Sequence, residues 1–470
     1  MVGQLGVSGI GTPLTVCKAR PSDALKQGCA EHNGRLTQLL REDEHSEWIM
    51  AATTADAQLG RMTAPVIWDG HDDQCLVHPR FASCQIRPDG SVKRRAVDNF
   101  SWSPTALGKE DSANGFTVIG EKMTHDTLDA LSEASSLFVD RVGEVPGLFK
   151  ADIDAAYRRI PIKKEHRWIA GIAFKMGGLV YKAMRFASPF GAVASGNAWE
   201  RIGAAIGFIA SFFLYLPLLR YVDDYFGPER LESMHHAMTC FARLVRALLG
   251  AGSIADNKLE CGRGLCILGV DISMSRRGFQ CRPAAGKIPK WVAIIDAAVA
   301  PGGCLMPGIA GKLAGKLSWG CSLIFRRMGR AMLRPIFDQK SLRSGNVCFE
   351  LRRALLWWRR ILLSDIAELK PWLQNGSKHA HMFCDAAGGK PHLGVVVFID
   401  GEILWTHLMP PQKVMSRFKS RGDNQIMGLE LLAISLGIST FGRRLHGRKL
   451  VIHSDNTGSE VPVSFCTHDV

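Results

Sequence analysis

Residues 219–227 read LRYVDDYFG, an apolar and aromatic run with two adjacent carboxylates at its centre. The apolar residues are typical of a buried strand, where an acidic pair without partners is costly. We therefore predict a β-hairpin with Asp223 and Asp224 at its tip, where carboxylates can hold a divalent metal ion. Mg²⁺ is bound in this way, through one or two carboxylates and the phosphates of a substrate. An ordinary Asp-Asp turn between two strands is the alternative.

Two stretches upstream carry residues of the same kind. Residues 148–162 read LFKADIDAAYRRIPI, in which an apolar strand leads to Asp152 and a short helical turn is expected to carry Tyr157. Residues 188–197 read SPFGAVASGN, a loop of Pro and Gly that opens a long apolar helix. Together they make an ordinary turn a poorer interpretation of residues 219–227.

Taken in order, these motifs resemble the palm of a reverse transcriptase: an Asp followed five residues later by Tyr, then Pro-Phe-Gly, then Tyr-x-Asp-Asp. Residues 257–260 (NKLE) and 267–270 (ILGV) resemble the last palm motif and the primer-grip hairpin. Phe190 stands where retroviral enzymes have Gln, and Pro-Phe-Gly is similar to retrotransposon polymerases. The overall resemblance is to DIRS-type retrotransposons and extends over residues 81–457.

The resemblance implies an α+β fold, a right-hand polymerase with fingers, palm and helical thumb followed by an incomplete RNase H-like α/β domain. The expected domains are an N-terminal helical extension (1–74), fingers and palm (75–275), a basic helical thumb and connection (276–375) and the RNase H-like domain (378–470). The expected activity is RNA-directed DNA synthesis, a nucleotidyl transfer from deoxynucleoside triphosphates to a primer 3′-hydroxyl. The expected partner is an RNA or DNA template with its primer duplex, and the oligomeric state stays open.

The same resemblance assigns catalytic and metal-binding roles to Asp152, Asp223 and Asp224. Asp152 and Asp223 would hold two Mg²⁺ ions, with Mn²⁺ as an alternative, and Asp224 would support them. Asp154 is the wrong distance from Tyr157 to be the shared aspartate. In relatives, the ring at the position of Tyr157 lies beneath the sugar and excludes a 2′-hydroxyl. The residues implied in substrate binding are Arg87, Arg94, Tyr157, Phe190, Gly191 and Lys258.

A cationic hairpin is expected near the start of the resemblance. Residues 86–98 read IRPDGSVKRRAVD and predict a strand, an Asp-Gly turn and a second strand. The segment resembles the fingers hairpin of reverse transcriptases, in which the residues matching Arg87 and Arg94 contact the incoming triphosphate. Arginine suits that role because its planar fork binds two phosphate oxygens at once. A solvated hairpin with its charges in water is the alternative.

The positive charge of the chain is concentrated in one region. The 470 residues include 58 Lys and Arg against 44 Asp and Glu, a formal charge of +14. Residues 276–360 alone hold 17 Lys and Arg against three acids, which accounts for the whole excess. Such a balance is typical of nucleic-acid-binding proteins and also of membrane-surface proteins.

The basic region is predicted to be helical from Gly278 onward. Segments 312–320, 325–334 and 351–363 place Leu and Trp at helical spacing and Arg on the remaining face. Most charged helix faces are simply solvated. Directly after a polymerase palm, however, a basic helical region favours a thumb that grips duplex phosphates through contacts that ignore sequence and weaken with salt.

The C-terminal segment places three acids in an ordered series of predicted elements. They are Asp385 in strand 381–388, Glu430 in helix 425–441 and Asp455 in strand 450–457, with a hairpin at Asp400-Gly401 after the first strand. The series resembles RNase H, which uses these three acids and a fourth to hold two metal ions. Three unrelated surface acids are the alternative. Residues 458–470 show neither the next strand nor the fourth acid, so we expect little or no RNase H activity.

Cysteine usage and apolar runs indicate the compartment. The 13 cysteines include no Cys-x-x-Cys pair, which indicates reduced thiols and an intracellular protein, cytoplasmic or nuclear. The N-terminus lacks the basic start and long apolar core of a secretory signal. Residues 202–219 are barely long enough to cross a membrane, and Gly203, Gly207 and Pro217 interrupt them. We predict a buried helix at 198–213 and no membrane partner.

The rival interpretation is a protein with the same fold and no catalytic activity, that is, a decayed or domesticated nucleic-acid-binding protein. The three intact palm acids favour an enzyme, although an element that decayed recently would still carry them. A primer-extension assay separates the two hypotheses.

Overall fold

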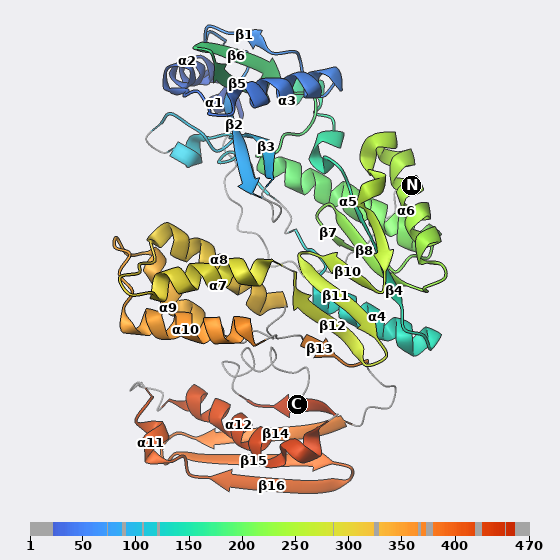
Figure 1. Cartoon of the computed structure of the whole chain (residues 1–470), viewed down its shortest axis with the longest axis vertical. Coiled ribbons are helices and arrows are strands. Elements are labelled where there is room, and N and C mark those ends of the chain that lie inside the picture. The colour runs from blue at the N-terminus through green and yellow to red at the C-terminus, as the bar shows by residue number, and fades with distance from the viewer. Residues whose placement is uncertain are drawn as a thin grey trace. The chain divides into compact units, whose positions relative to one another are not determined.

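The computed structural model describes residues 22–72, 74–86, 91–105, 108–119, 123–284, 286–323, 329–364, 368–372, 379–418, 425–446 and 448–455 (Figure 1). The chain divides into two compact units. Unit 1 comprises residues 1–126, 150–226 and 236–260, and unit 2 comprises residues 127–149, 227–235 and 261–470. Helices and several sheets occur together, so the predicted α+β class is confirmed.

The first sheet of unit 1 has the strand order β1-β6-β5-β2-β3. Its strands are β1 (Val66–Ile67), β2 (Val77–Ile86), β3 (Val92–Asp98), β5 (Gly171–Met176) and β6 (Leu179–Met184). β2 pairs with β5 in parallel and with β3 as an antiparallel hairpin. The two strands of the predicted cationic hairpin are thereby confirmed, whereas Arg87 and the Asp89-Gly90 turn lie outside the described residues.

Helices near the N-terminus pack on this sheet. They are α1 (Ser22–Gln27), α2 (Cys29–Leu39) and α3 (Ser46–Gln58). Leu36 of α2 joins a buried cluster with Val77 of β2, and Ile49 of α3 joins another with Phe174 of β5. Helices α2 and α3 therefore share the core of this sheet, and Figure 1 shows them beside it.

A second sheet has the order β7-β8-β4-β9. Its strands are β4 (Gly147–Asp152), β7 (Leu219–Tyr221), β8 (Asp224–Glu229) and β9 (Leu259–Gly262), and the helices beside it are α5 (Val193–Phe213) and α6 (Met234–Leu249). The ring of Tyr225 on β8 lies 4.9 Å from that of Phe241 on α6, and its hydroxyl donates a 2.8 Å hydrogen bond to the Gly203 carbonyl on α5. Helix α6 therefore packs against this sheet through Phe241.

Helix α5 differs from the prediction in two ways. It begins at Val193, earlier than the expected start at 198. One stripe, which includes Trp199 and Ile206, is buried, whereas Phe208 and Phe212 are 50% and 61% exposed. The expectation of a buried helix is therefore wrong for this second face, because apolar composition alone does not show how many sides of a helix meet neighbours.

Unit 2 includes α4 (Leu128–Val142) and a sheet with the order β10-β11-β12-β13. The strands are β10 (Gly264–Ile267), β11 (Val270–Ser275), β12 (Gly278–Pro283) and β13 (Glu368–Lys370). The prediction that the chain becomes helical at Gly278 is wrong for residues 278–283, because β12 pairs with β11 on one side and with β13 on the other. The second partner is distant in sequence, so local spacing could not reveal it.

A helical region follows in unit 2. Its helices are α7 (Lys287–Val299), α8 (Pro307–Leu323), α9 (Arg330–Lys340) and α10 (Phe349–Leu363). Arg359 of α10 binds Asp296 of α7 at 2.6 Å. The helices predicted at 312–320 and 351–363 are confirmed; of the segment 325–334, residues 325–328 lie outside the described residues and the remainder begins α9.

The C-terminal part of unit 2 is a sheet with the order β16-β15-β14-β17 (Figure 1). Its elements are β14 (His379–Ala387), β15 (His392–Ile399), β16 (Glu402–Leu408), α11 (Gln412–Met415), α12 (Ile426–Leu445) and β17 (Lys449–His453). β17 runs parallel to β14, and the other pairs are antiparallel. Asp400 and Gly401, at φ 52° and 81°, form the predicted turn between β15 and β16.

Alternation explains the packing of this sheet. Every second residue of β14 is buried, and Leu429 and Ala433 of α12 join the same core cluster. By length and composition, α12 could cross a membrane, as could α6 if it is taken together with the sharply bent segment after it. This is weak support for a membrane span, because a core helix has the same properties, and α12 packs on a sheet.

Candidate functional site

The LRYVDDYFG stretch forms the predicted hairpin. β7 and β8 pair antiparallel with Tyr221 opposite Asp224, so Val222 and Asp223 form a two-residue turn. Val222 adopts φ 56°, in the left-handed region that such tight turns use. Asp223 therefore lies at the tip, and Asp224 begins β8.

Asp152 ends β4, which is the neighbour of β8 in the sheet. The N–H of Ile153 donates a 3.0 Å hydrogen bond to the carbonyl oxygen of Asp223, which joins the two strand ends. Burial and then the Asp152 charge raise the pKa of Asp223, while burial, Asp223 and Asp152 raise the pKa of Asp224 to about 6. Carboxylates that repel one another in this way form a donor set that a divalent cation would neutralise.

Lys258, predicted to bind substrate, lies against the same acids. Its Nζ is 2.8 Å from Asp152 Oδ2 and 3.4 Å from Asp154 Oδ1. Burial alone would lower the pKa of Lys258, but the hydrogen bond to Asp152 and the charges of both carboxylates outweigh it and raise the pKa. The ammonium therefore supplies part of the positive charge that the acid cluster needs.

Two aromatic rings lie beside the acids. Tyr157, in the short turn Ala156–Arg159, stacks with Phe190 at a centroid distance of 6.1 Å and an interplanar angle of 20°. Burial and then the Asp223 charge raise the pKa of Tyr157. The phenol therefore lies near enough to Asp223 for its charge to act on it. Gly191 has φ 127°, and a Cβ there would overlap the Asp98 carbonyl oxygen, so the loop requires glycine.

The triphosphate contact of the hairpin arginines, Arg87 and Arg94, stays a prediction. Arg94 is exposed on β3, opposite Cys84 of β2, and Arg87 lies outside the described residues. The neighbour of Arg94, Arg95, is the hairpin arginine whose charge acts to lower the pKa of Asp223. Arg95 was not predicted as a site residue; the consecutive arginines were a signal for it, since adjacent strand residues point to opposite faces.

A buried ionic cluster supports the loop that carries Phe190. Asp98 binds Arg80 Nε at 3.2 Å and Arg185 Nε at 2.6 Å, and the side chains of all three are fully buried. The N–H of Asp98 donates a 3.0 Å hydrogen bond to the Phe190 carbonyl oxygen. This cluster could not be predicted from the sequence, because its members come from three separate strands or loops.

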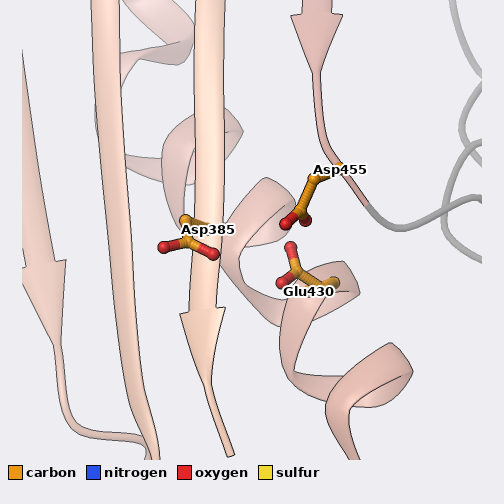
Figure 2. Close-up of side chains that lie close together, drawn as sticks. All are labelled: Asp385, Glu430 and Asp455. Carbon is orange, nitrogen blue, oxygen red and sulfur yellow. The ribbon is translucent and has the colours of Figure 1, made fainter.

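A second acid cluster lies in the C-terminal sheet (Figure 2). Asp385, Glu430 and Asp455 each bring one carboxylate oxygen within 4.8 Å of the others. The parallel register explains this, because Phe383 pairs with His453 and each aspartate follows two residues later. The structure thus gathers these three acids as the sequence predicted. Within the described residues, the palm acids Asp152, Asp223 and Asp224 do not form a group of three with ligand atoms all within 4.8 Å of one another.

Glu430 is the buried member of the second cluster, 2% exposed. Its Oε1 accepts a 3.1 Å hydrogen bond from the N–H of Ala386. Burial, together with the charges of Asp385 and Asp455, raises the pKa of Glu430 despite that hydrogen bond. A buried carboxylate beside two others suits a divalent cation better than it suits an empty protein interior.

The sequence matches no protein-family profile and no curated protein. Three solved structures of the foamy viral protease-reverse transcriptase are similar to it. The first is a dRH form with double-stranded DNA, with a TM-score of 0.50 and 13% identity over 87% of this chain and 62% of that chain. The second is a complex with an RNA/DNA hybrid, with a TM-score of 0.51 and 14% identity over 90% of this chain and 51% of that chain. The third is a complex with double-stranded DNA, with a TM-score of 0.50 and 12% identity over 96% of this chain and 92% of that chain. This chain thus spans about three fifths and half of the first two chains. The likeness shows a reverse-transcriptase-like fold.

Proposed function

We propose that this chain is an RNA-directed DNA polymerase that extends a primer 3′-hydroxyl with deoxynucleoside triphosphates. The observation that carries the proposal is the placement of Asp152 at the end of β4 and of Asp223 and Asp224 at the turn into the neighbouring strand β8, in a chain with a reverse-transcriptase-like fold. The first sheet of unit 1 would be the fingers, the sheet with β4 and β8 the palm, and α7 to α10 the thumb. Origin from a DIRS-type retrotransposon and an intracellular location belong to the same proposal.

The donor chemistry supports a divalent-metal site. Asp152 and Asp223 would hold Mg²⁺, with Asp224 beside them, because burial and then repulsion by neighbouring carboxylates raise the pKa values of Asp223 and Asp224, and a bound cation would offset both effects. Two bound Mg²⁺ ions would activate the primer hydroxyl and stabilise the leaving pyrophosphate. The residues of the chain would position the reactants and neutralise charge, which is most of what such transfers require.

The surrounding side chains fit a nucleotide. The stacked rings of Tyr157 and Phe190 would support the sugar, and the cationic β2–β3 hairpin would reach the triphosphate through Arg95, the arginine whose charge acts on Asp223. Lys258, already bound to Asp152, would be available to the same phosphates once a metal ion replaces it.

Extension of oligo(dT) on poly(rA), compared with poly(dA), tests the proposal and its rival. An active polymerase elongates the primer on the RNA template in Mg²⁺. A decayed nucleic-acid-binding protein binds the same duplex and leaves the primer unchanged.

We expect the helical region to supply much of the duplex affinity. Arg334 of α9 and Arg353 and Arg360 of α10 are exposed. Changing all three to Ala should weaken binding to every sequence alike and reduce the slope of log K against log salt by about 0.9 for each lost phosphate contact. Fluorescence anisotropy across a salt series measures this slope.

The matched control changes three exposed arginines elsewhere, Arg35, Arg41 and Arg443, to Ala. This variant has the same net charge as the first and should keep most of the slope. An equal loss of slope in both variants would mean that general charge, and not a thumb, drives binding.

We also propose a metal-binding role for the acid cluster of the C-terminal sheet, which the distances in this cluster favour. In an Asp223→Asn protein, Mn²⁺ titration followed by electron paramagnetic resonance should still detect a bound ion. Adding Asp385→Asn should weaken that binding about tenfold or more, since one of three charged ligands is lost. Asp338→Asn, which changes an exposed acid of α9, is the control.

RNase H activity should nevertheless be weak or absent. Three acids can hold one ion, and two-metal hydrolysis requires that the second ion be held as well. A labelled RNA–DNA hybrid incubated with the protein in Mg²⁺ or Mn²⁺ should remain largely intact. Robust cleavage that disappears in Asp385→Asn would show that this expectation is wrong.

A further inference from the structure

The turn that carries Asp223 contains a residue poorly suited to it. Val222 adopts φ 56°, and a β-branched side chain in the left-handed region is a conformational outlier. Gly, Asn or Asp would adopt this conformation with less strain. Such a conformation persists only where the surroundings hold it, so the contacts of Val222 show what holds the turn.

Two buried donors hold the carbonyl oxygen of Val222. The indole Nε1–H of Trp199 on α5 donates to it at 2.8 Å, and a guanidinium N–H of Arg220 donates at 3.1 Å. Trp199 is 1% exposed and Arg220 is 8% exposed. The carbonyl is thus fixed from inside the unit rather than from solvent.

The Arg220 guanidinium is itself fixed. It donates to Glu200 Oε1 of α5 at 2.5 Å, and the Arg220 backbone N–H donates to Asp126 Oδ2 at 2.7 Å. Gly203 of α5 completes the fit, because a Cβ there would lie 3.0 Å from the Arg220 guanidinium. Within one helical turn of α5, the indole of Trp199, the carboxylate of Glu200 and Gly203 therefore lie against β7 and the Val222–Asp223 turn that follows it.

These contacts bear directly on Asp223. The peptide that joins Val222 to Asp223 is held by Trp199 and Arg220, and the Asp223 carbonyl accepts the Ile153 N–H at 3.0 Å. Both peptides that flank the Asp223 Cα are therefore anchored. The direction in which its side chain leaves the backbone is set by these anchors, whereas a free two-residue turn would allow several directions.

We propose that Trp199 and Arg220 are positioning residues that hold the Val222–Asp223 peptide so that Asp223 is presented to a divalent cation together with Asp152 and Asp224. The inference rests on the proposed metal site and extends it to residues that touch neither metal nor substrate. Partners of this kind that orient a ligand typically change metal affinity or activity by about 10- to 100-fold when they are removed.

The test measures Mn²⁺ affinity in an Asp385→Asn background, in which binding at the C-terminal cluster is weakened. Trp199→Phe keeps an aromatic ring and deletes the N–H donor, and we expect it to weaken Mn²⁺ binding about tenfold. Val222→Asn, added to Trp199→Phe, should restore most of the affinity, because Asn accepts the left-handed conformation without the clamp. Trp291→Phe, at a tryptophan buried on α7, is the control for trimming a core ring.

Restoration by Val222→Asn separates positioning from packing, because a cavity left by the smaller ring would not be filled by a change in the turn. Unchanged affinity in Trp199→Phe, a loss that Val222→Asn does not restore, or a wild-type site that binds no Mn²⁺ would overturn the inference. Primer extension is scored separately. A protein that shows the expected affinity series without extending primers would contradict the proposed polymerase function and leave the positioning role standing.

Discussion

Asp223→Asn is expected to reduce primer extension by about 1000-fold or more, the scale on which removing one charged group acts in phosphoryl transfer. Asp223 lies at the tip of the β7–β8 turn, beside Asp152. The substitution keeps the shape of the side chain and removes the negative charge that a hard divalent cation requires. The fold should persist, because the loss of charge relieves repulsion within the acid cluster.

The measurement is steady-state extension of oligo(dT) on poly(rA) in Mg²⁺, with circular dichroism as the check on folding. Asp154→Asn is the matched control. Asp154 lies close to Asp152 and binds the same Lys258, but we assign it no metal ion. It should keep most of the activity. Extension at the wild-type rate by Asp223→Asn would remove the basis for the two-metal proposal.

The sequence predicted those parts of the fold that short-range patterns determine. The apolar stretch 381–388 predicted most of β14, and the Asp400-Gly401 pair predicted the turn after β15, because both depend on residues close in the chain. In the candidate site, the hairpin that carries Asp223 followed from one apolar run with two misplaced charges.

Long-range contacts set the features that the sequence did not predict. β12 is a strand because β11 and β13 pair with it, and β13 lies on the far side of the helical region in sequence. The Lys258–Asp152 ion pair joins a residue of the short helical turn Asp256–Lys258 to the end of β4. Each such contact depends on how the chain returns on itself, which the spacing of residues does not record.

The two acid clusters include one contact that the sequence could predict and one that it could not. The parallel pairing of β14 with β17 brings Asp385 and Asp455 together, and this pairing could be anticipated from the order of the elements. The indole of Trp199 beneath Val222 could not, since a tryptophan in an apolar helix is most simply a core residue. The left-handed φ of Val222 likewise has no signal in its own side chain, which disfavours that conformation.

Tyr157→Ala should admit ribonucleotides. The ring of Tyr157 stacks with Phe190 beside Asp223, at the place where we put the sugar of the incoming nucleotide. Removing it opens space for a 2′-hydroxyl that the wild-type ring would exclude. We expect the preference for deoxynucleotides over ribonucleotides, as the ratio of kcat/KM values, to fall about 100-fold, a steric discrimination of under 3 kcal/mol.

Tyr157→Phe separates the ring from its hydroxyl. It keeps the stacked arrangement with Phe190 and should retain most of the discrimination, because exclusion depends on the volume of the ring. Single-nucleotide incorporation with dTTP and UTP on poly(rA) measures the ratio for each variant. If Tyr157→Ala stays active and rejects UTP as strongly as the wild type does, the sugar does not lie over this ring. Tyr157 would then serve only in packing against Phe190, and selectivity would have to come from residues that approach the nucleotide from another side.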